Sequence, residues 1–128
     1  MLNTVVVVDD SDVDLLFARI MLERSGAVHR MLGFESARAA LDFLAGDEGA
    51  SVDLILLDIH MPGMNGFEFL QQYEAGARGA GRPTVPVVML SSSPDPADRA
   101  RAAQHRCVRG YLVKPLNLDS ARALAEPV

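Results

Sequence analysis

The chain has 128 residues, of which 49% are hydrophobic and 23% are charged, and its formal net charge is -5. This length suits one domain with a substantial core, and the composition is that of a soluble globular protein rather than a disordered chain. The longest apolar runs, such as Val5 to Val8, are far too short to cross a membrane, and Asp9 and Asp10 interrupt the N-terminus before a signal-peptide core could form. The negative charge argues against nucleic acid as the main partner. The single cysteine, Cys107, allows no internal disulfide, so we expect a cytoplasmic protein.

The charge is unevenly distributed along the chain. Residues 1–90 hold six arginines against thirteen acidic residues, a balance of -7, whereas residues 91–128 hold five arginines and one lysine against four acidic residues, a balance of +2. Any basic interaction surface would therefore lie in the last third, although a solvated helix face would give the same count. Lys114 is the only lysine of the sequence, which makes its position worth a separate explanation.

The first predicted element is a buried strand over Thr4–Val8, a β-branched run that ends at two aspartates. A helix should follow, because Ser11 or Asp12 can cap its start and Gly26 can end it. Its apolar positions at helical spacing predict the side that faces the core: Val13, Leu16, Phe17, Ile20 and Met21. A weaker strand over Val28–Phe34 is expected at an edge of the sheet, since it contains charged and polar residues.

The middle of the chain holds the most apolar strand. A second helix, which Ser36 caps and Gly46 ends, comes before it. Leu54–Leu57 then reads as a strand buried on both faces, and it ends on Asp58. Chain breakers follow at once: Pro62, Gly63, Asn65 and Gly66. Asp58 is therefore predicted at the carboxyl end of a central strand, where ligands bind in open α/β sheets, although a lone aspartate there could simply cap a turn.

The alternation continues to the end of the chain. The predicted elements are a helix from Asn65 or Gly66, a flexible surface loop over residues 75–84, a strand over Val85–Leu90, a helix from Asp95 or Pro96, a strand over Gly110–Val113 and a final helix over Leu118–Ala125. Five alternations of strand and helix predict a parallel sheet with helices on both faces. We expect one α/β domain over residues 1–128, with the flavodoxin-like doubly wound strand order 2-1-3-4-5 and five helices.

Four of the predicted strands end on polar residues, and in a parallel sheet these ends meet at one edge. The residues are Asp9 and Asp10, Asp58, Ser91 and Lys114. Carboxylates about 4 Å apart repel by roughly 4 kcal/mol per pair at an effective dielectric near 20, so such a site favours a divalent cation, and hard oxygen ligands suit Mg²⁺. The cation could neutralise a phosphoryl group on Asp58, which Lys114 and Ser91 would also contact. A purely structural cluster of ion pairs is the alternative.

The motifs resemble those of the receiver domain of bacterial two-component response regulators. They occur in order as Val-Asp-Asp, Leu-Leu-Asp-Ile-His-Met-Pro-Gly-Met-Asn-Gly, Val-Val-Met-Leu-Ser and Tyr-Leu-Val-Lys-Pro, so the resemblance covers essentially the whole chain. It implies that Asp58 accepts phosphate from a histidine kinase, that Asp10 binds Mg²⁺ directly, and that Asp9 acts more through water. It also implies that the backbone carbonyl of His60 completes the protein ligands, and that Ser91 and Lys114 contact the phosphoryl group. Tyr111 matches the switch aromatic, although it could simply be a core residue.

The resemblance also implies partners. One is a histidine kinase or hybrid kinase, and the finer resemblance of residues 91–99 is to receivers that partner phytochrome-type and other hybrid kinases. The other is a downstream protein or a second copy of the domain, bound through the fourth helix, last strand and fifth helix. Two other classes remain open at this point. A phosphatase of the haloacid dehalogenase type would also use an aspartate and Mg²⁺, but normally has a second aspartate where His60 stands. A flavin-binding flavodoxin-like module would need a phosphate loop where the acidic segment Asp9–Asp12 stands.

Overall fold

The computed structural model describes residues 1–125, and within them the chain alternates between strand and helix. The strands are β1 (Leu2–Val8), β2 (Val28–Phe34), β3 (Leu54–Leu57), β4 (Val87–Ser91) and β5 (Val108–Val113). The helices are α1 (Asp12–Ser25), α2 (Ala37–Ala45), α3 (Gly66–Gly79), α4 (Pro96–Ala103) and α5 (Leu118–Leu124), with a short 3₁₀ helix, η1 (Asp47–Ser51), before β3. The last three residues of the predicted domain, 126–128, lie outside the described part.

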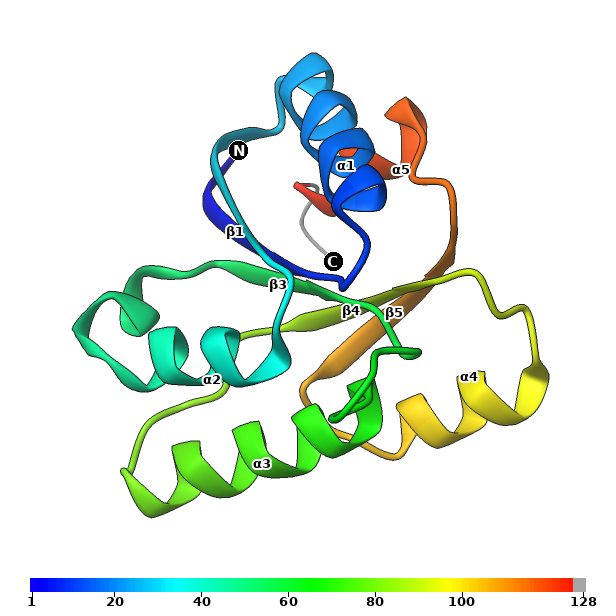
Figure 1. The fold of residues 1–128 in the computed structure, drawn as a ribbon. Helices are drawn as coiled ribbons and strands as arrows, with labels where there is room; N and C mark the ends of the chain where they lie inside the picture. The colour runs from blue at the N-terminus through cyan, green and yellow to red at the C-terminus, as the bar shows by residue number, and fades with distance from the viewer. Residues whose placement is uncertain (126–128) are drawn as a thin grey trace.

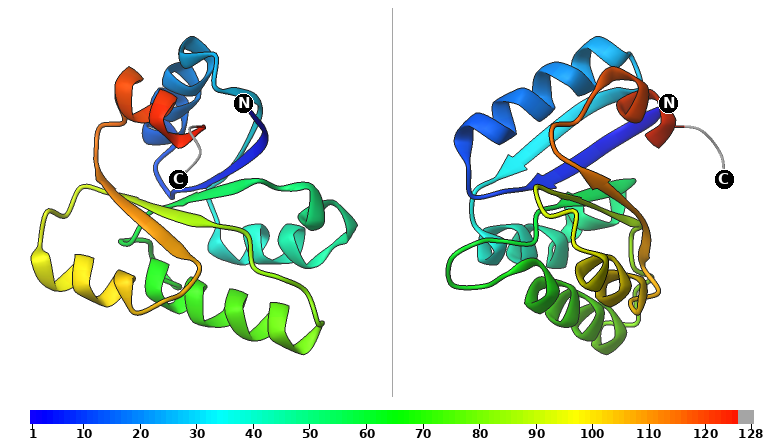
Figure 2. Two further views of the ribbon diagram at one scale, coloured as in Figure 1. Left: turned by 180° about the vertical axis from the view of Figure 1, so that it is seen from behind. Right: turned by 90° about the vertical axis from the view of Figure 1, so that its right-hand side faces the viewer.

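The strands form one parallel sheet in the order β2-β1-β3-β4-β5. Helices α1 and α5 cover one face of the sheet, and α2, α3 and α4 cover the other (Figure 1; Figure 2). The predicted doubly wound flavodoxin-like fold is therefore confirmed, including the edge position of β2 and the adjacent central positions of β1 and β3. No helix among residues 1–125 is both long enough and apolar enough to cross a membrane.

Each face of the sheet has its own hydrophobic core. On the face of α2 and α3, buried side chains such as Phe69 and Leu70 pack against inward-facing residues of β1 and β3. On the other face, Leu22 of α1 and Leu124 of α5 pack against the opposite residues of the same strands. A strand segment covered on both faces must be apolar, which is why the buried parts of three strands are apolar runs: Val5–Val8 of β1, all of β3 and Val87–Leu90 of β4.

The predicted core side of α1 is wrong. Val13 and Leu16 are 70% and 58% exposed, and Phe17 and Ile20 are also exposed, whereas Ala18 and Leu22 are buried on the opposite side of the helix. Met21 alone of the predicted set packs, partly buried, against the core. On the side that does face the sheet, Leu15 packs over β2: a β-carbon on Gly33 would lie 3.4 Å from its side chain, and Ala18 and Leu22 lie in the same core.

The predicted loop over residues 75–84 is wrong in its first half, because α3 continues to Gly79. Tyr73 is buried on this helix, and its hydroxyl accepts a hydrogen bond of 2.7 Å from the backbone N–H of Val85. The Arg82 guanidinium donates to the carbonyls of Ala45 and Gly46 at the end of α2. These tertiary contacts hold the end of α3 in place and override the low helix propensity of its glycines.

Candidate functional site

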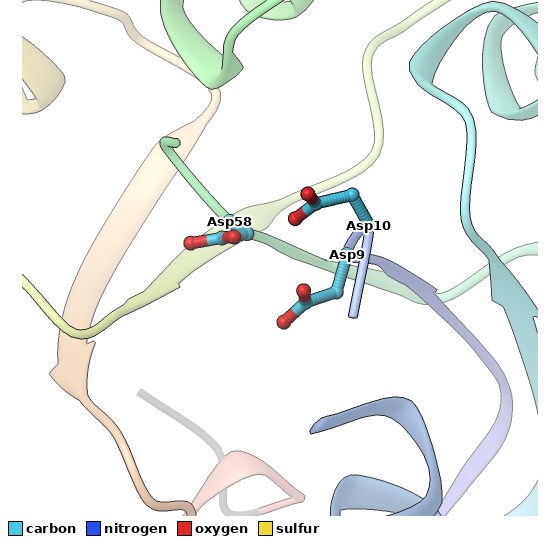
Figure 3. A group of neighbouring side chains, drawn as sticks. All are labelled: Asp9, Asp10 and Asp58. Atoms are coloured by element: carbon cyan, nitrogen blue, oxygen red, sulfur yellow. The ribbon is translucent and has the colours of Figure 1, made fainter. Parts of the chain in front are cut away.

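Three aspartates meet at the carboxyl edge of the sheet. Asp9 and Asp10 follow β1, and Asp58 follows β3, which pairs with β1. One carboxylate oxygen from each of the three lies within 4.8 Å of the others (Figure 3). Asp9 and Asp58 are buried and Asp10 is exposed. Three carboxylates at this spacing are hard oxygen donors that fit Mg²⁺ with room for water ligands, so the donor set agrees with the predicted metal site.

Burial and the neighbouring carboxylates make Asp58 reluctant to ionise. Desolvation is the largest influence and raises the pKa of Asp58. The positive charge of Lys114 lowers this pKa, and the negative charge of Asp9 raises it. The backbone N–H of Ile59 donates to Asp58 Oδ1 at 2.9 Å. The net result is a carboxyl group with a raised pKa, as expected for a carboxylate buried beside other carboxylates.

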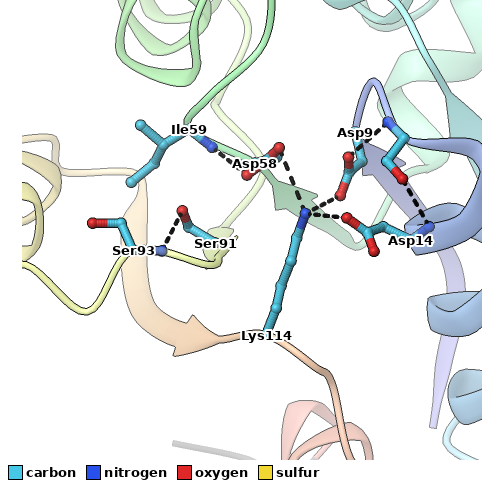
Figure 4. Close-up of polar contacts among 8 residues, drawn as sticks. Asp9, Asp14, Asp58, Ile59, Ser91, Ser93 and Lys114 are labelled. Atoms are coloured by element: carbon cyan, nitrogen blue, oxygen red, sulfur yellow. Dashed lines mark hydrogen bonds and ion pairs between the residues drawn. The ribbon is translucent and has the colours of Figure 1, made fainter.

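Lys114 enters the site from the end of β5. Its Nζ atom lies 2.6 Å from Asp9 Oδ2, 2.8 Å from Asp14 Oδ2 and 3.6 Å from Asp58 Oδ2 (Figure 4). Burial disfavours the charged ammonium, but the hydrogen bonds to Asp14 and Asp9 outweigh it, so the pKa of Lys114 is raised. The ammonium therefore stays charged among the carboxylates. Asp14 was not predicted as part of this site, since an acidic residue in the first turn of a helix already has a local explanation in the helix dipole.

Ser91 is the last residue of β4. The pairing of β3 with β4 sets Leu57 opposite Met89, so Ser91 reaches the same edge of the sheet as Asp58. Its side chain is buried, and its hydroxyl oxygen accepts a hydrogen bond of 3.2 Å from the backbone N–H of Ser93 (Figure 4). The predicted set of residues thus converges on one edge from three neighbouring strands and from β5.

The loop between β3 and α3 is packed tightly against the site. The backbone N–H of Gly66 donates to the carbonyl of Ile59 at 2.8 Å. A β-carbon on Gly66 would lie 2.5 Å from the carbonyl oxygen of Asp58. His60 is in this loop, and its exposed imidazole lies 4.0 Å from Asp98, not among the three carboxylates. The described geometry therefore gives no support to a metal ligand on the His60 ring.

Tyr111 is bound to the loop that follows Ser91. Its hydroxyl donates to the carbonyl of Ser93 at 2.6 Å, and the Arg99 guanidinium lies 4.7 Å from its ring centroid. The Ser93 hydroxyl in turn donates to Asp98 at 2.7 Å. This arrangement joins β5, the loop after β4 and α4. Arg99 belongs to the predicted partner surface of the fourth helix, last strand and fifth helix, whereas Asp98 was not predicted, because its position is ordinary for a helix on the surface.

Three arginines of the last third have partners within the domain. Arg101 lies with its guanidinium 4.1 Å from the ring centroid of Phe67, and Arg109 donates to the carbonyl of Leu124. Arg122 forms an ion pair with Asp119 in the same helix. These contacts are compatible with both predicted alternatives, a basic interaction surface and a solvated helix face.

Residues 5–126 match the family described as the response regulator receiver domain. The chain belongs to this family. Among solved structures, this receiver domain is similar to a two-component response regulator from Cytophaga hutchinsonii, with a TM-score of 0.86, 28% identity, and coverage of 96% of this chain and 93% of that one. It is also similar to the bacteriophytochrome response regulator RtBRR, with a TM-score of 0.76, 32% identity, and coverage of 96% and 75%.

Curated relatives place the same domain in proteins of different size. The receiver domain is 33% identical over 110 residues to the sensory/regulatory protein RpfC of Xanthomonas campestris, covering 86% of this chain but only 14% of that protein. It is 30% identical over 127 residues to the probable methanogenesis regulatory protein FilR2 of Methanothrix harundinacea, covering 97% of this chain and 79% of that protein. Membership of this family supports phosphoacceptor signalling over the phosphatase and flavin alternatives. Receiver domains bind Mg²⁺ at an acidic pocket, and the three aspartates form such a pocket here.

Proposed function

We propose that this receiver domain accepts a phosphoryl group on Asp58 from a histidine kinase or hybrid kinase in a Mg²⁺-dependent reaction. One observation carries the proposal: Asp58 is buried at the carboxyl end of β3, with a carboxylate oxygen of each of two further aspartates within 4.8 Å and the Lys114 ammonium 3.6 Å away. A carboxylate oxygen of Asp58 attacks phosphorus, the bond from phosphorus to the donor atom breaks, and the donor leaves with the bonding electron pair. Bound Mg²⁺ would neutralise negative charge on the transferred group.

The residues around Asp58 take separate roles in this proposal. Asp10 and Asp58 would hold the metal directly, Asp9 through water, and the carbonyl of His60 would complete the protein ligands. Lys114 would contact one phosphoryl oxygen as a point charge, and Ser91 would donate a hydrogen bond to another. All of these positions lie on the ends of packed strands or on the tight loop after β3, so the fold fixes them before the donor arrives.

The exposed side of α1 supports docking of the kinase beside this site. Val13, Leu16, Phe17 and Ile20 are exposed apolar residues of one helix, and Asp14 of the same helix reaches Lys114. Contiguous exposed apolar surface marks protein interaction sites more often than chance. The proposed kinase would cover this side of α1 while it presents its phosphohistidine to Asp58.

The outgoing signal is proposed to pass through the surface of α4, β5 and α5. Phosphorylation would draw Ser91 toward Asp58, and the loop that binds the Tyr111 hydroxyl begins directly after Ser91. Tyr111 and the Arg99 side chain beside its ring would each exchange between two conformations, and movement of that loop would change the populations of these conformations. A downstream protein or a second copy of the domain would bind this surface.

Labelling with a small phosphodonor tests the assignment of Asp58. With Mg²⁺ and acetyl phosphate, intact-mass spectrometry should show one added phosphoryl group that is stable to acid and labile to base. Asp58→Asn should remove it, whereas Asp42→Asn, an exposed carboxylate on α2, should not. Full labelling of the Asp58→Asn protein would exclude Asp58 as the acceptor.

Melting curves test the metal separately. Mg²⁺ that binds only the folded state should raise the melting temperature by mass action. Asp10→Ala should abolish this rise, while Asp42→Asn should retain it. An unchanged melting temperature of the unsubstituted protein at millimolar Mg²⁺ would contradict the proposed site.

A further inference from the structure

Asp14 is a fourth carboxylate at the site, and it comes from a different element than the three aspartates of the metal cluster. Its Oδ2 atom accepts a hydrogen bond of 2.8 Å from Lys114 Nζ, whereas Asp58 Oδ2 lies 3.6 Å from the same atom (Figure 4). Asp14 and Lys114 are separated by 100 positions in the sequence, so this is a purely tertiary contact. The ammonium is thus bound to Asp9 and Asp14 more closely than to the proposed phosphoacceptor, Asp58.

The position of Asp14 is fixed by the start of α1. Its backbone N–H donates to the Ser11 hydroxyl oxygen at 3.2 Å, and the backbone N–H of Ser11 donates to Asp9 Oδ1 at 3.0 Å. These bonds tie the first turn of the helix to the acidic edge of the sheet. Asp14 is therefore held in place by the same segment that presents Asp9, so it is a defined partner of Lys114 and not a chance surface contact.

A lysine ammonium has three N–H donors, and Asp9 and Asp14 each lie within hydrogen-bond distance of it. A phosphoryl group on Asp58 would need a donor from the same ammonium, and its negative charge would be repelled by Asp14. We propose that Asp14 is a positioning residue: it holds Lys114 away from Asp58 before phosphorylation, and release of this contact accompanies binding of the phosphoryl group. This inference rests on the proposed phosphorylation of Asp58.

The single lysine of the sequence allows a direct test. Protein labelled with ¹⁵N-lysine gives one side-chain ammonium signal, that of Lys114, which reports its ion pairs through its chemical shift and the exchange of its protons with water. In the absence of any ligand, Asp14→Asn should move this signal and speed its proton exchange, and Asp14→Glu should largely restore both. Asp12→Asn is the matched control, because Asp12 lies in the same turn, is exposed, and forms no ion pair within residues 1–125. An ammonium signal that Asp14→Asn leaves unchanged would overturn the inference.

Binding of beryllofluoride, a tetrahedral analogue of a phosphoryl group on a carboxylate, measures the functional consequence. With Mg²⁺ present, Asp14→Asn should lower the dissociation constant of beryllofluoride roughly threefold to tenfold, from the loss of one partly exposed ion pair and of one repulsive charge. Asp12→Asn should change it by less than about twofold, since an exposed charge without a partner is screened. Equal effects of the two substitutions would refute a specific role for Asp14. Failure of the unsubstituted protein to bind beryllofluoride would instead count against the proposed function, whereas the ligand-free ammonium signal tests the contact between Asp14 and Lys114 independently of it.

Discussion

Replacing Gly66 with alanine should destabilise the domain and disturb the metal site together. The new β-carbon would lie 2.5 Å from the carbonyl oxygen of Asp58 and 2.9 Å from the Cα atom of Ile59. Both are backbone atoms in a well-packed loop, so a rotamer change cannot relieve the clash, and overpacking of this kind reduces the free energy of unfolding by roughly 1–3 kcal/mol or more. The backbone that carries Asp58 has to move, which should also weaken Mg²⁺ binding.

Two other glycines provide matched controls. Gly76→Ala, on the exposed side of α3, adds a β-carbon with no heavy atom within 4 Å, so it should stabilise the protein by about 1 kcal/mol through helix propensity alone. Gly49 lies in η1, and a β-carbon there would clash with the backbone of Leu44 at the end of α2. Gly49→Ala should therefore destabilise the protein but leave the metal site intact.

Urea denaturation at fixed Mg²⁺ gives the stabilities, and the rise in melting temperature with Mg²⁺ gives the metal affinity. We expect Gly66→Ala to lose both stability and metal affinity, Gly49→Ala to lose stability alone, and Gly76→Ala to gain stability. A Gly66→Ala protein within about 0.5 kcal/mol of the unsubstituted protein, the usual range of surface substitutions, would refute the packing argument. If Gly49→Ala weakened Mg²⁺ binding as strongly as Gly66→Ala, the loss would reflect general destabilisation and not the loop.

Three further predictions follow from the surroundings of single residues. Because burial raises the pKa of Asp58, the unfolded chain releases this proton at lower pH than the folded protein, so metal-free Asp58→Asn should be more stable than the unsubstituted protein at neutral pH. This difference in stability should shrink as pH falls below the raised pKa of the folded state and should be absent below the ordinary aspartate pKa of 3.8, which urea titrations at several pH values would check. Burial raises the pKa of Cys107 to about 11, so this thiol should react with a disulfide reagent at pH 8 far more slowly in the native protein than in urea, and equal rates would contradict its buried position. Tyr111→Phe should lose the hydrogen bond to the Ser93 carbonyl and with it about 1 kcal/mol of stability. Beryllofluoride should also shift fewer NMR signals of residues 91–122 in this variant than in the unsubstituted protein. If the shifts in the unsubstituted protein all lay outside residues 91–122, the proposed signalling surface would be refuted.

The order and direction of the strands were predictable because short apolar runs with polar ends have few other interpretations. Leu54–Leu57 is too short and too apolar for a surface helix, and Asp58 directly after it implies the edge of a parallel sheet. The side of α1 that faces the core was not predictable from spacing. Apolar residues occur around most of this helix, so Ala18 and Leu22 compete with Leu16 and Ile20 for the core-facing side, and only the packing of α1 on the sheet decides between the two sides.

The same distinction holds within the candidate site. The sequence by itself determined that Asp9, Asp58, Ser91 and Lys114 lie at one edge, because parallel strands bring their carboxyl ends together whatever the details of packing. Only the tertiary structure decided that Asp14 binds Lys114, that the Tyr111 hydroxyl binds the Ser93 carbonyl, and that the His60 imidazole lies near Asp98. Each of these contacts joins segments whose local sequence has no unusual feature. Whether such segments contact each other depends on how helices and loops pack across the sheet edge, and no periodic pattern in the sequence predicts it.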